Sequence, residues 1–396
     1  MRQERAARKQ QANWSKPHGV DFVLLVLALA LLAFGLVMVE SAGAVRGVSR
    51  TQDPSPYYYF LQQLKWALAG AGCALIAVKV PYFFWRRVVG VAVLGSIALL
   101  SLVLFSPAGI VAKGSARWLN FLGINVQPSE IAKLAIVLFL AHALDRYPVK
   151  EIRDAALPGL VIAITLGLIF KQPDLGTTLV LGATCLVMYL QTELPWRWFA
   201  AITAPLAVAG AYFVRHADYQ WQRIMVWLHP WNYASGLGYQ ITSAEIAFGS
   251  GGLFGVGLGK SLQKYGFLPE NHTDMIFAIV GEELGLLGTL LLIGLFVALY
   301  ARAFMISHQC PDRFGRLLGF GLTSALAIQT AVNLAVVTGV FPVTGITLPL
   351  ISYGGSSLLI TMAQIGVLLN ISRYRPLPET PGQRFSEAPA KTRLKV

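Results

Sequence analysis

Apolar runs separated by shorter polar connections make up most of the chain. Several of them are about 20 residues long and almost free of charge, which is the length an α-helix needs to cross a bilayer. This pattern predicts an all-α polytopic membrane protein with about ten transmembrane helices. The expected spans cover residues 20–41, 60–80, 88–105, 128–143, 155–170, 177–190, 196–214, 274–300, 317–340 and 348–371.

The polar segments divide the chain into three parts. A basic tail covers residues 1–19, the membrane domain covers 20–372, and a polar tail covers 373–396. The longest polar stretch inside the domain, 215–273, is expected to form a large loop between the seventh and eighth spans. No sequence repeat supports an inverted-repeat transporter.

Charge gives the orientation of these spans. The net charge of +13 would fit a nucleic-acid partner, but the basic residues lie between apolar runs, where they orient helices in the bilayer. When alternate connections are assigned to opposite sides, roughly two thirds of the 32 Lys and Arg residues fall on the side of both termini. The positive-inside rule makes that side cytoplasmic. Residues 215–273 therefore face outward, and no nucleic-acid partner is expected.

Acid, imidazole and acid side chains gather in one short passage before the eighth span, at Glu270, His272 and Asp274. Pro269 keeps this passage extended, because proline disfavours the α region for the residue before it. Thr273 or Asp274 could simply cap the following helix by accepting a hydrogen bond from its first N–H groups. Crowding of these side chains at the membrane edge, beside a glycine-rich loop, favours a functional site instead.

Two close pairs of charged residues fall well inside the predicted spans, where charge is costly and usually marks function. Glu130 and Lys133 are spaced i, i+3, so they share a helical face and can pair. Such a pair can also be purely structural. Glu282 and Glu283 lie about two turns into the eighth span. They should face a cavity or find cations, for which Lys133 and Arg117 are candidates.

Two polar connections carry further candidate residues. The run 113–118 contains Arg117 in a Gly/Ser loop before the fourth span. Residues 171–178 contain Lys171 and Asp174 between the fifth and sixth spans, in what could equally be an ordinary Pro/Asp/Gly turn.

Glycine-rich backbone marks two other segments. The outer stretch holds Arg223 and the run 249–260, which ends in Lys260 and whose backbone amides could approach an anion closely. Phe254 stands where a phosphate-binding loop needs glycine, so we do not expect ATP binding. Residues 339–357 combine two prolines with several glycines, which indicates either a broken, re-entrant segment or a tight loop.

Six ordered motifs span nearly the whole membrane region: QPSEIAKLA at 127–135, KQPDLGTT at 171–178, GYQ…IAFGSGGLFGVGLG at 238–259, LPENHTD at 268–274, EELG at 282–285 and PLISYGGSS at 349–357. Together they resemble the SEDS family, which comprises FtsW, RodA and SpoVE, the peptidoglycan polymerases of elongation, division and sporulation. The basic N-terminal extension and polar C-terminal tail are more similar to the division branch, FtsW, than to RodA.

The resemblance implies a glycosyltransferase that polymerises lipid II at the outer face of the cytoplasmic (inner) membrane, at the division septum. By the motif match, Asp274 is the catalytic residue, while Glu130 and Lys133, with Glu282 and Glu283, shape the cavity. A divalent cation, Mg²⁺ or Mn²⁺, or basic side chains must offset charge on the leaving pyrophosphate. Substrate contacts are expected at Arg117, Lys171, Asp174, Arg223, Lys260, Glu270, His272 and Ser356.

The family also implies partners, namely a class B penicillin-binding protein (the division transpeptidase), other late divisome proteins and membrane lipids. Two other functions stay open: a lipid II flippase, and a non-catalytic divisome scaffold. Asp274 separates them, because an outer acid is essential for polymerisation but need not be for transport or scaffolding.

Overall fold

The computed structural model describes residues 17–51, 53–106, 109–112, 115–121, 124–147, 149–216 and 218–374. Within that part of the chain, a helix lies at each of the ten apolar runs. These helices are α2 (Phe22–Val48), α3 (Tyr58–Lys79), α4 (Trp85–Phe105), α5 (Pro128–Arg146), α6 (Ile152–Lys171), α7 (Leu175–Tyr189), α8 (Trp196–His216), α11 (Ile276–Gln309), α12 (Arg313–Val337) and α13 (Gly355–Ser372).

Seven helices of the described chain are long and apolar enough to cross a membrane. They are α2, α3, α4 extended by the short turn η1 (Tyr82–Phe84), α6, α11, α12 and α13. Helix α7 has only 15 residues, and α5 carries Glu130, Lys133 and Asp145 along its length. The structure therefore confirms a mostly helical protein with seven candidate spans, whereas ten crossings remain a prediction.

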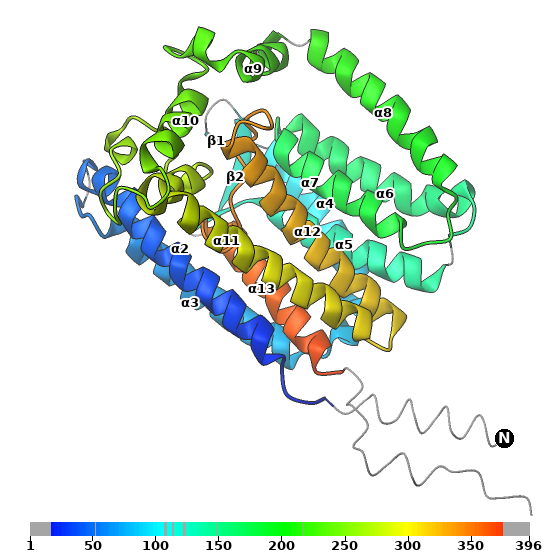
Figure 1. Ribbon diagram of the computed structural model, residues 1–396. Coiled ribbons are helices and arrows are strands. Elements are labelled where there is room, and N and C mark those ends of the chain that lie inside the picture. The colour runs from blue at the N-terminus through cyan, green and yellow to red at the C-terminus, as the bar shows by residue number, and fades with distance from the viewer. Residues whose placement is uncertain are drawn as a thin grey trace, which may run out of the picture.

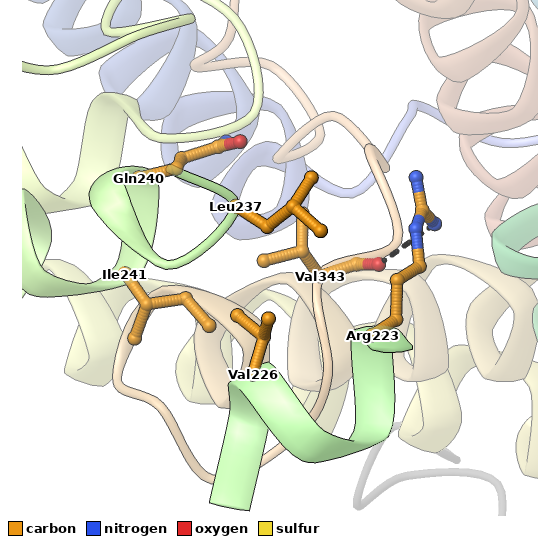
Figure 2. Close-up of a pocket in the computed structure, with 6 residues that line it drawn as sticks. All are labelled: Arg223, Val226, Leu237, Gln240, Ile241 and Val343. Atoms are coloured by element: carbon orange, nitrogen blue, oxygen red, sulfur yellow. Dashed lines mark hydrogen bonds between the residues drawn. The ribbon is translucent and has the colours of Figure 1, made fainter. Parts of the chain in front are cut away.

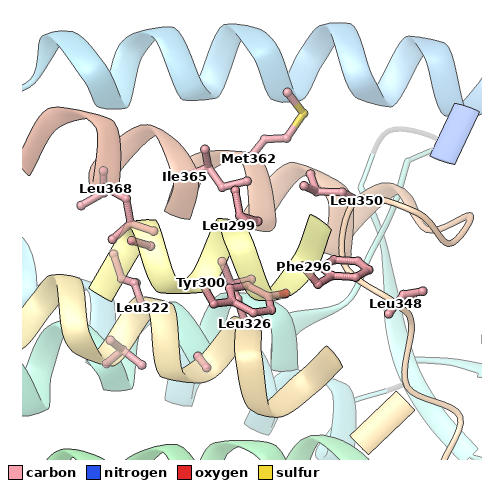
Figure 3. Close-up of a cluster of buried hydrophobic side chains, with 14 of the residues drawn as sticks. Phe296, Leu299, Tyr300, Leu322, Leu326, Leu348, Leu350, Met362, Ile365 and Leu368 are labelled. Atoms are coloured by element: carbon pink, nitrogen blue, oxygen red, sulfur yellow. The ribbon is translucent and has the colours of Figure 1, made fainter. Parts of the chain in front are cut away.

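Helices α11, α12 and α13 pack together in the middle of the bundle (Figure 1). Figure 3 shows their buried side chains meeting, with Phe296 from α11, Leu326 from α12 and Ile365 from α13. Helix α3 lies directly against α13, because small residues let the backbones approach: a Cβ on Gly366 would lie 2.6 Å from the carbonyl oxygen of Ala74. Many apolar side chains of α3 and α4 stay exposed, as expected of helices that face lipid.

A small antiparallel sheet lies between α4 and α5, where the sequence predicts a loop. Its strands, in the order β1-β2-β3, are β1 (Gly109–Ala112), β2 (Ser115–Phe121) and β3 (Ile124–Val126). Leu119 is paired on both sides, with Gly109 and Val126, and is only 2% exposed. The all-α prediction is therefore wrong in this region, because strands of three to seven residues are too short to show a clear alternation.

The predicted outer loop 215–273 is largely folded. It contains α9 (Asp218–Leu228), η2 (Pro230–Tyr233), α10 (Tyr239–Gly251) and η3 (Gln263–Tyr265). Helix α10 packs on α11 and buries Ile241, Ala244 and Ala247. Helices α8 and α9 extend around the edge of the bundle (Figure 1).

The segment between α12 and α13 is irregular, as its prolines and glycines predict. Helix α13 begins at Gly355 and not near residue 348, and both Gly339 and Gly345 adopt positive φ. The other side of the molecule holds the start and end of the described chain, where the His18 N–H donates to the Arg373 carbonyl at 2.7 Å. The tails 1–16 and 375–396, with Lys113 and Gly114, lie outside the described residues.

Candidate functional site

Asp274 lies directly before α11, with 8% of its surface exposed. The N-cap of this helix is Met275, whose side chain makes no capping hydrogen bond, so neither Thr273 nor Asp274 occupies the N-cap position. The Thr273 hydroxyl lies 3.1 Å from Asp274 Oδ1 and 2.9 Å from Glu270 Oε2. Because one hydroxyl proton can serve only one acceptor fully, Thr273 places two carboxylates side by side around a single donor.

Helix α12 fixes the backbone around Asp274. Asn333 Nδ2 donates to the carbonyl of Asp274 at 2.9 Å and to that of Ile346 at 2.7 Å. A Cβ on Gly345 would lie 3.8 Å from Asp274 Oδ2, and Gly345 adopts φ of 73°. The irregular segment around residues 343–347 is therefore the neighbour of the Asp274 carboxylate.

Two buried polar atoms beside this segment lack a hydrogen-bond partner among the described residues. They are Asn333 Oδ1 and Thr344 Oγ1. Buried polar atoms in native proteins are nearly always satisfied by protein or water. These two atoms therefore mark a polar place next to Asp274 where water or a ligand group would be stabilised.

The predicted pairing of Glu130 with Lys133 is confirmed, with a separation of 3.0 Å between two buried side chains. Lys133 Nζ also donates to Gln329 Oε1 at 2.6 Å, and Gln329 Nε2 donates to the carbonyl of Thr347 at 3.0 Å. Gln329 and Asn333 are one helical turn apart on α12. A polar chain thus runs from the ion pair on α5 to the segment beside Asp274.

The N-termini of α5, α7 and α13 meet on the other side of this segment. Asp174 caps α7 by accepting from the Thr177 N–H at 3.1 Å and accepts from Gln127 Nε2 at 3.4 Å. Ser356 Oγ accepts from the Gln127 N–H at 3.2 Å. A Cβ on Gly176 would press within 2.5 Å of Ile346. Converging helix N-termini present partial positive charge, which favours an anion.

Arg223 lines a pocket of about 140 Å³ between α9, α10 and the 343–347 segment. Figure 2 shows its guanidinium directed at the Val343 carbonyl, to which it donates at 3.2 Å, with Leu237 and Ile241 across the pocket. Gln240 also lines this pocket, and its buried Nε2 atom has no hydrogen-bond partner among the described residues. The pocket therefore carries the polar side chains of Arg223 and Gln240, and its wall at Val343 is two residues before Gly345 in the chain.

Two other residues expected to contact substrate are engaged with neighbouring parts of the protein. His272 is 4% exposed and packs between the rings of Tyr59 and Tyr353, with centroid distances of 4.4 and 5.6 Å. Arg117 donates to the carbonyls of Gln172 and Pro173, so it ties β2 to the α6–α7 turn.

Two predicted cations are exposed. Lys171 ends α6, and Lys260 ends the glycine-rich run. Neither side chain forms a hydrogen bond or ion pair with the described residues around Asp274.

The sequence offers Lys133 and Arg117 as cations for Glu282 and Glu283, but the structure gives these two acids other partners. Glu283 accepts from Lys264 Nζ at 3.3 Å and from the Ser41 hydroxyl at 2.7 Å. Glu282 accepts from the hydroxyl of Ser261 and from the Leu262 N–H at 2.8 Å. These contacts hold the loop before Asp274 against α11.

Sequence reasoning missed several residues of this region. A signal was present for Gln329 and Asn333, because amide side chains inside an apolar helix need partners. No local signal identified Lys264, which is nineteen positions from Glu283.

Comparisons with known proteins agree with this architecture. The family model described as "Cell cycle protein", FtsW/RodA/SpoVE, matches residues 22–376. A probable peptidoglycan glycosyltransferase FtsW of Geobacter metallireducens is 40% identical over 89% of this chain and 94% of its own. Stage V sporulation protein E of Bacillus subtilis is 39% identical over 91% and 99%.

Solved structures show the same likeness. A chain from a peptidoglycan synthase complex, studied for the structural coordination of polymerization and crosslinking, superposes with a TM-score of 0.74 at 32% identity, covering 89% of this chain and 98% of its own. The rod shape determining protein RodA of Thermus thermophilus superposes with a TM-score of 0.68 at 31% identity, covering 91% of this chain and 98% of its own. The chain therefore belongs to the FtsW/RodA/SpoVE family of multi-pass membrane proteins.

Proposed function

We propose that this protein is a peptidoglycan glycosyltransferase that polymerises lipid II at the outer face of the cytoplasmic membrane, with Asp274 as the catalytic carboxylate. Relatives at about 40% identity carry that activity in their names. The observation that carries the proposal is the placement of Asp274: a largely buried carboxylate that shares the Thr273 hydroxyl with Glu270 and does not occupy the N-cap position of α11. A carboxylate in such a place can accept a proton from an acceptor hydroxyl.

In the proposed reaction, the 4-hydroxyl oxygen of the acceptor GlcNAc bonds to the anomeric carbon of the donor MurNAc. The bond from that carbon to the pyrophosphate breaks with inversion, and its electron pair leaves with undecaprenyl pyrophosphate. The hydroxyl proton passes to Asp274. Arg223 and the N-termini of α5, α7 and α13 supply positive charge to offset the growing charge on the pyrophosphate.

Asp274 and Glu270 fit a divalent cation, Mg²⁺ or Mn²⁺, that is shared with the substrate. Magnesium is usually held by one or two carboxylates plus phosphate oxygens and water. No group of three or more His, Cys, Asp or Glu residues gathers in the described chain, so the other ligands would come from pyrophosphate and water. The bound cation would offset negative charge on the leaving group.

We further propose that ten helices cross the membrane with both termini in the cytoplasm, and that the protein works at the division septum. The structural relative from a complex that coordinates polymerization and crosslinking supports a penicillin-binding transpeptidase as partner. The irregular outer region around Asp274 would then receive the sugars of lipid II while its polyprenyl tail stays in the bilayer.

The test is lipid II polymerisation by the purified protein with its transpeptidase partner, whose crosslinking serine is inactivated. Wild type should form glycan chains, and both Asp274→Ala and Asp274→Asn should form none while still binding the partner. Glu193→Ala, which removes an exposed carboxylate, is the matched control and should remain active. Equal product from Asp274→Ala would remove Asp274 from catalysis, and product from none of the proteins would favour the flippase or scaffold functions.

A further inference from the structure

A second cavity, of about 570 Å³, lies where α11 ends and α12 begins. Asp274 precedes the other end of α11, and the part of this helix after the kink at Gly285, residues 286–309, is by itself about 36 Å long. The cavity shares no lining residue with the Arg223 pocket. It is therefore separate from the candidate catalytic site and stands at the end of the bundle that holds both described chain ends (Figure 1).

The walls of this cavity are amphipathic. Phe304, Leu317 and Phe320 give an apolar floor, in which the rings of Phe304 and Phe320 lie 5.3 Å apart. Arg313 and Arg316 stand at the rim with exposed side chains. No carboxylate is among the described residues that line it.

Acidic residues in the adjoining elements already have cationic partners. Asp312 pairs with Arg86 at 2.9 Å, an arginine that Asp145 also contacts at 3.2 Å, and it caps α12 by accepting from the Gly315 N–H at 3.2 Å. Glu193 pairs with Lys150 at 3.4 Å. Neither Arg313 nor Arg316 pairs with a carboxylate of the described chain, so the rim keeps the positive charge of both arginines.

We propose that this cavity binds an anionic phospholipid of the adjacent leaflet. The phosphate of the headgroup lies against Arg313 and Arg316, and the first part of an acyl chain lies over Phe304 and Phe320. Helices α11 and α12 are both candidate membrane spans, so their ends fall at the level of lipid headgroups. Basic pockets between membrane helices are suited to acidic headgroups. The apolar floor favours a lipid over a soluble phosphate, which would gain nothing from aromatic contact.

Native mass spectrometry of the full chain, released from detergent after addition of phosphatidylglycerol or phosphatidylcholine, tests the proposal. Wild type should retain phosphatidylglycerol over phosphatidylcholine. The double variant Arg313→Gln/Arg316→Gln should bind phosphatidylglycerol roughly 30-fold more weakly, because each basic residue near the surface contributes about 1 kcal/mol. Arg313→Lys/Arg316→Lys keeps both charges and should retain most of the preference.

The matched control is Arg87→Gln/Arg153→Gln, which removes two exposed arginines at the same end of the bundle, outside the cavity. It should bind phosphatidylglycerol like wild type. A monodisperse elution profile and an unchanged lipid-free unfolding temperature exclude misfolding of each variant. Equal retention by both glutamine variants would overturn the proposal, as would equal retention of the two lipids by wild type. Displacement of the lipid by millimolar inorganic phosphate would show a soluble-anion site and overturn it as well.

Discussion

Two buried charge clusters, one on α5 and one on α11, are balanced in different ways. On α5, Glu130 and Lys133 form a pair one turn apart, with a neutral amide as the second partner of the lysine. On α11, Glu282 and Glu283 are adjacent and 1% and 0% exposed, with Lys264 as the cation bound to Glu283. The first cluster is locally neutral, whereas the second has two acids around one base and relies on hydroxyl and backbone donors.

The two clusters also serve different parts of the site. The α5 pair reaches the segment beside Asp274 through Gln329 and Thr347. The α11 pair of carboxylates instead fastens the glycine-rich loop and the turn after it, since Ser261 and Leu262 donate to them. The locally neutral α5 cluster therefore supports the segment beside Asp274, and the α11 cluster with its excess acid holds the glycine-rich loop in place.

The largest expected effect is removal of the cation from either cluster. Lys264→Met leaves two adjacent buried carboxylates, and Lys133→Met leaves one. Loss of one partner of a buried ion pair usually costs about 3–5 kcal/mol. We expect Lys264→Met near the upper end and Lys133→Met near the lower end of that range, measured as the free energy of unfolding in mixed micelles.

Matched double variants sharpen this prediction. Lys133→Met with Glu130→Gln should recover most of the lost stability, because the buried charge is gone. Lys264→Met with Glu283→Gln should recover less, because Glu282 stays acidic beside it. A larger loss for Lys133→Met than for Lys264→Met would show that the surplus carboxylate is not what distinguishes the clusters.

A substitution at Gly285 tests directly how the glycine-rich loop packs against α11. Gly285 breaks the α11 hydrogen-bond pattern with φ of 68°, and a Cβ there would lie 2.4 Å from the Gly255 backbone nitrogen. Gly285→Ala should lower the free energy of unfolding by about 2–3 kcal/mol, from strain in the left-handed region plus the clash. Gly294→Ala, in the same helix with nothing within 4 Å of its Cβ, should be neutral or slightly stabilising. Equal effects from the two would contradict this.

Asn333→Ala tests the contact between α12 and the backbone of Asp274. The variant loses the hydrogen bonds to the carbonyls of Asp274 and Ile346. Each such bond contributes about 1 kcal/mol, so polymerisation by the partnered enzyme should fall about tenfold as Asp274 loosens, with a modest loss of stability. Thr338→Ala removes an exposed hydroxyl at the C-cap of the same helix and should leave activity unchanged. Wild-type rates from Asn333→Ala would separate this amide from catalysis.

The contrast between the clusters explains how far sequence reasoning reaches. Spacing along one helix predicts the Glu130–Lys133 pair, because both members lie on the same short segment. The same reasoning proposes the wrong cations for Glu282 and Glu283, because Lys264 meets them only after the outer loop folds back on α11. The sheet around Leu119 and the N-cap of α11 at Met275 were missed for a related reason. Their geometry depends on packing between segments, not on local pattern.

The smallest expected effect concerns the exposed edge of the site. Arg46 lies 3.8 Å from Glu270, with side chains 50% and 24% exposed, and solvent screens a pair of this kind. Arg46→Gln should change the free energy of unfolding by less than about 0.5 kcal/mol. The measurement is the same micelle unfolding curve used for the buried lysines, with Arg153→Gln as an exposed control. A loss of several kcal/mol would contradict this prediction. It would mean that the Arg46–Glu270 pair stabilises the protein as much as the buried ion pairs do.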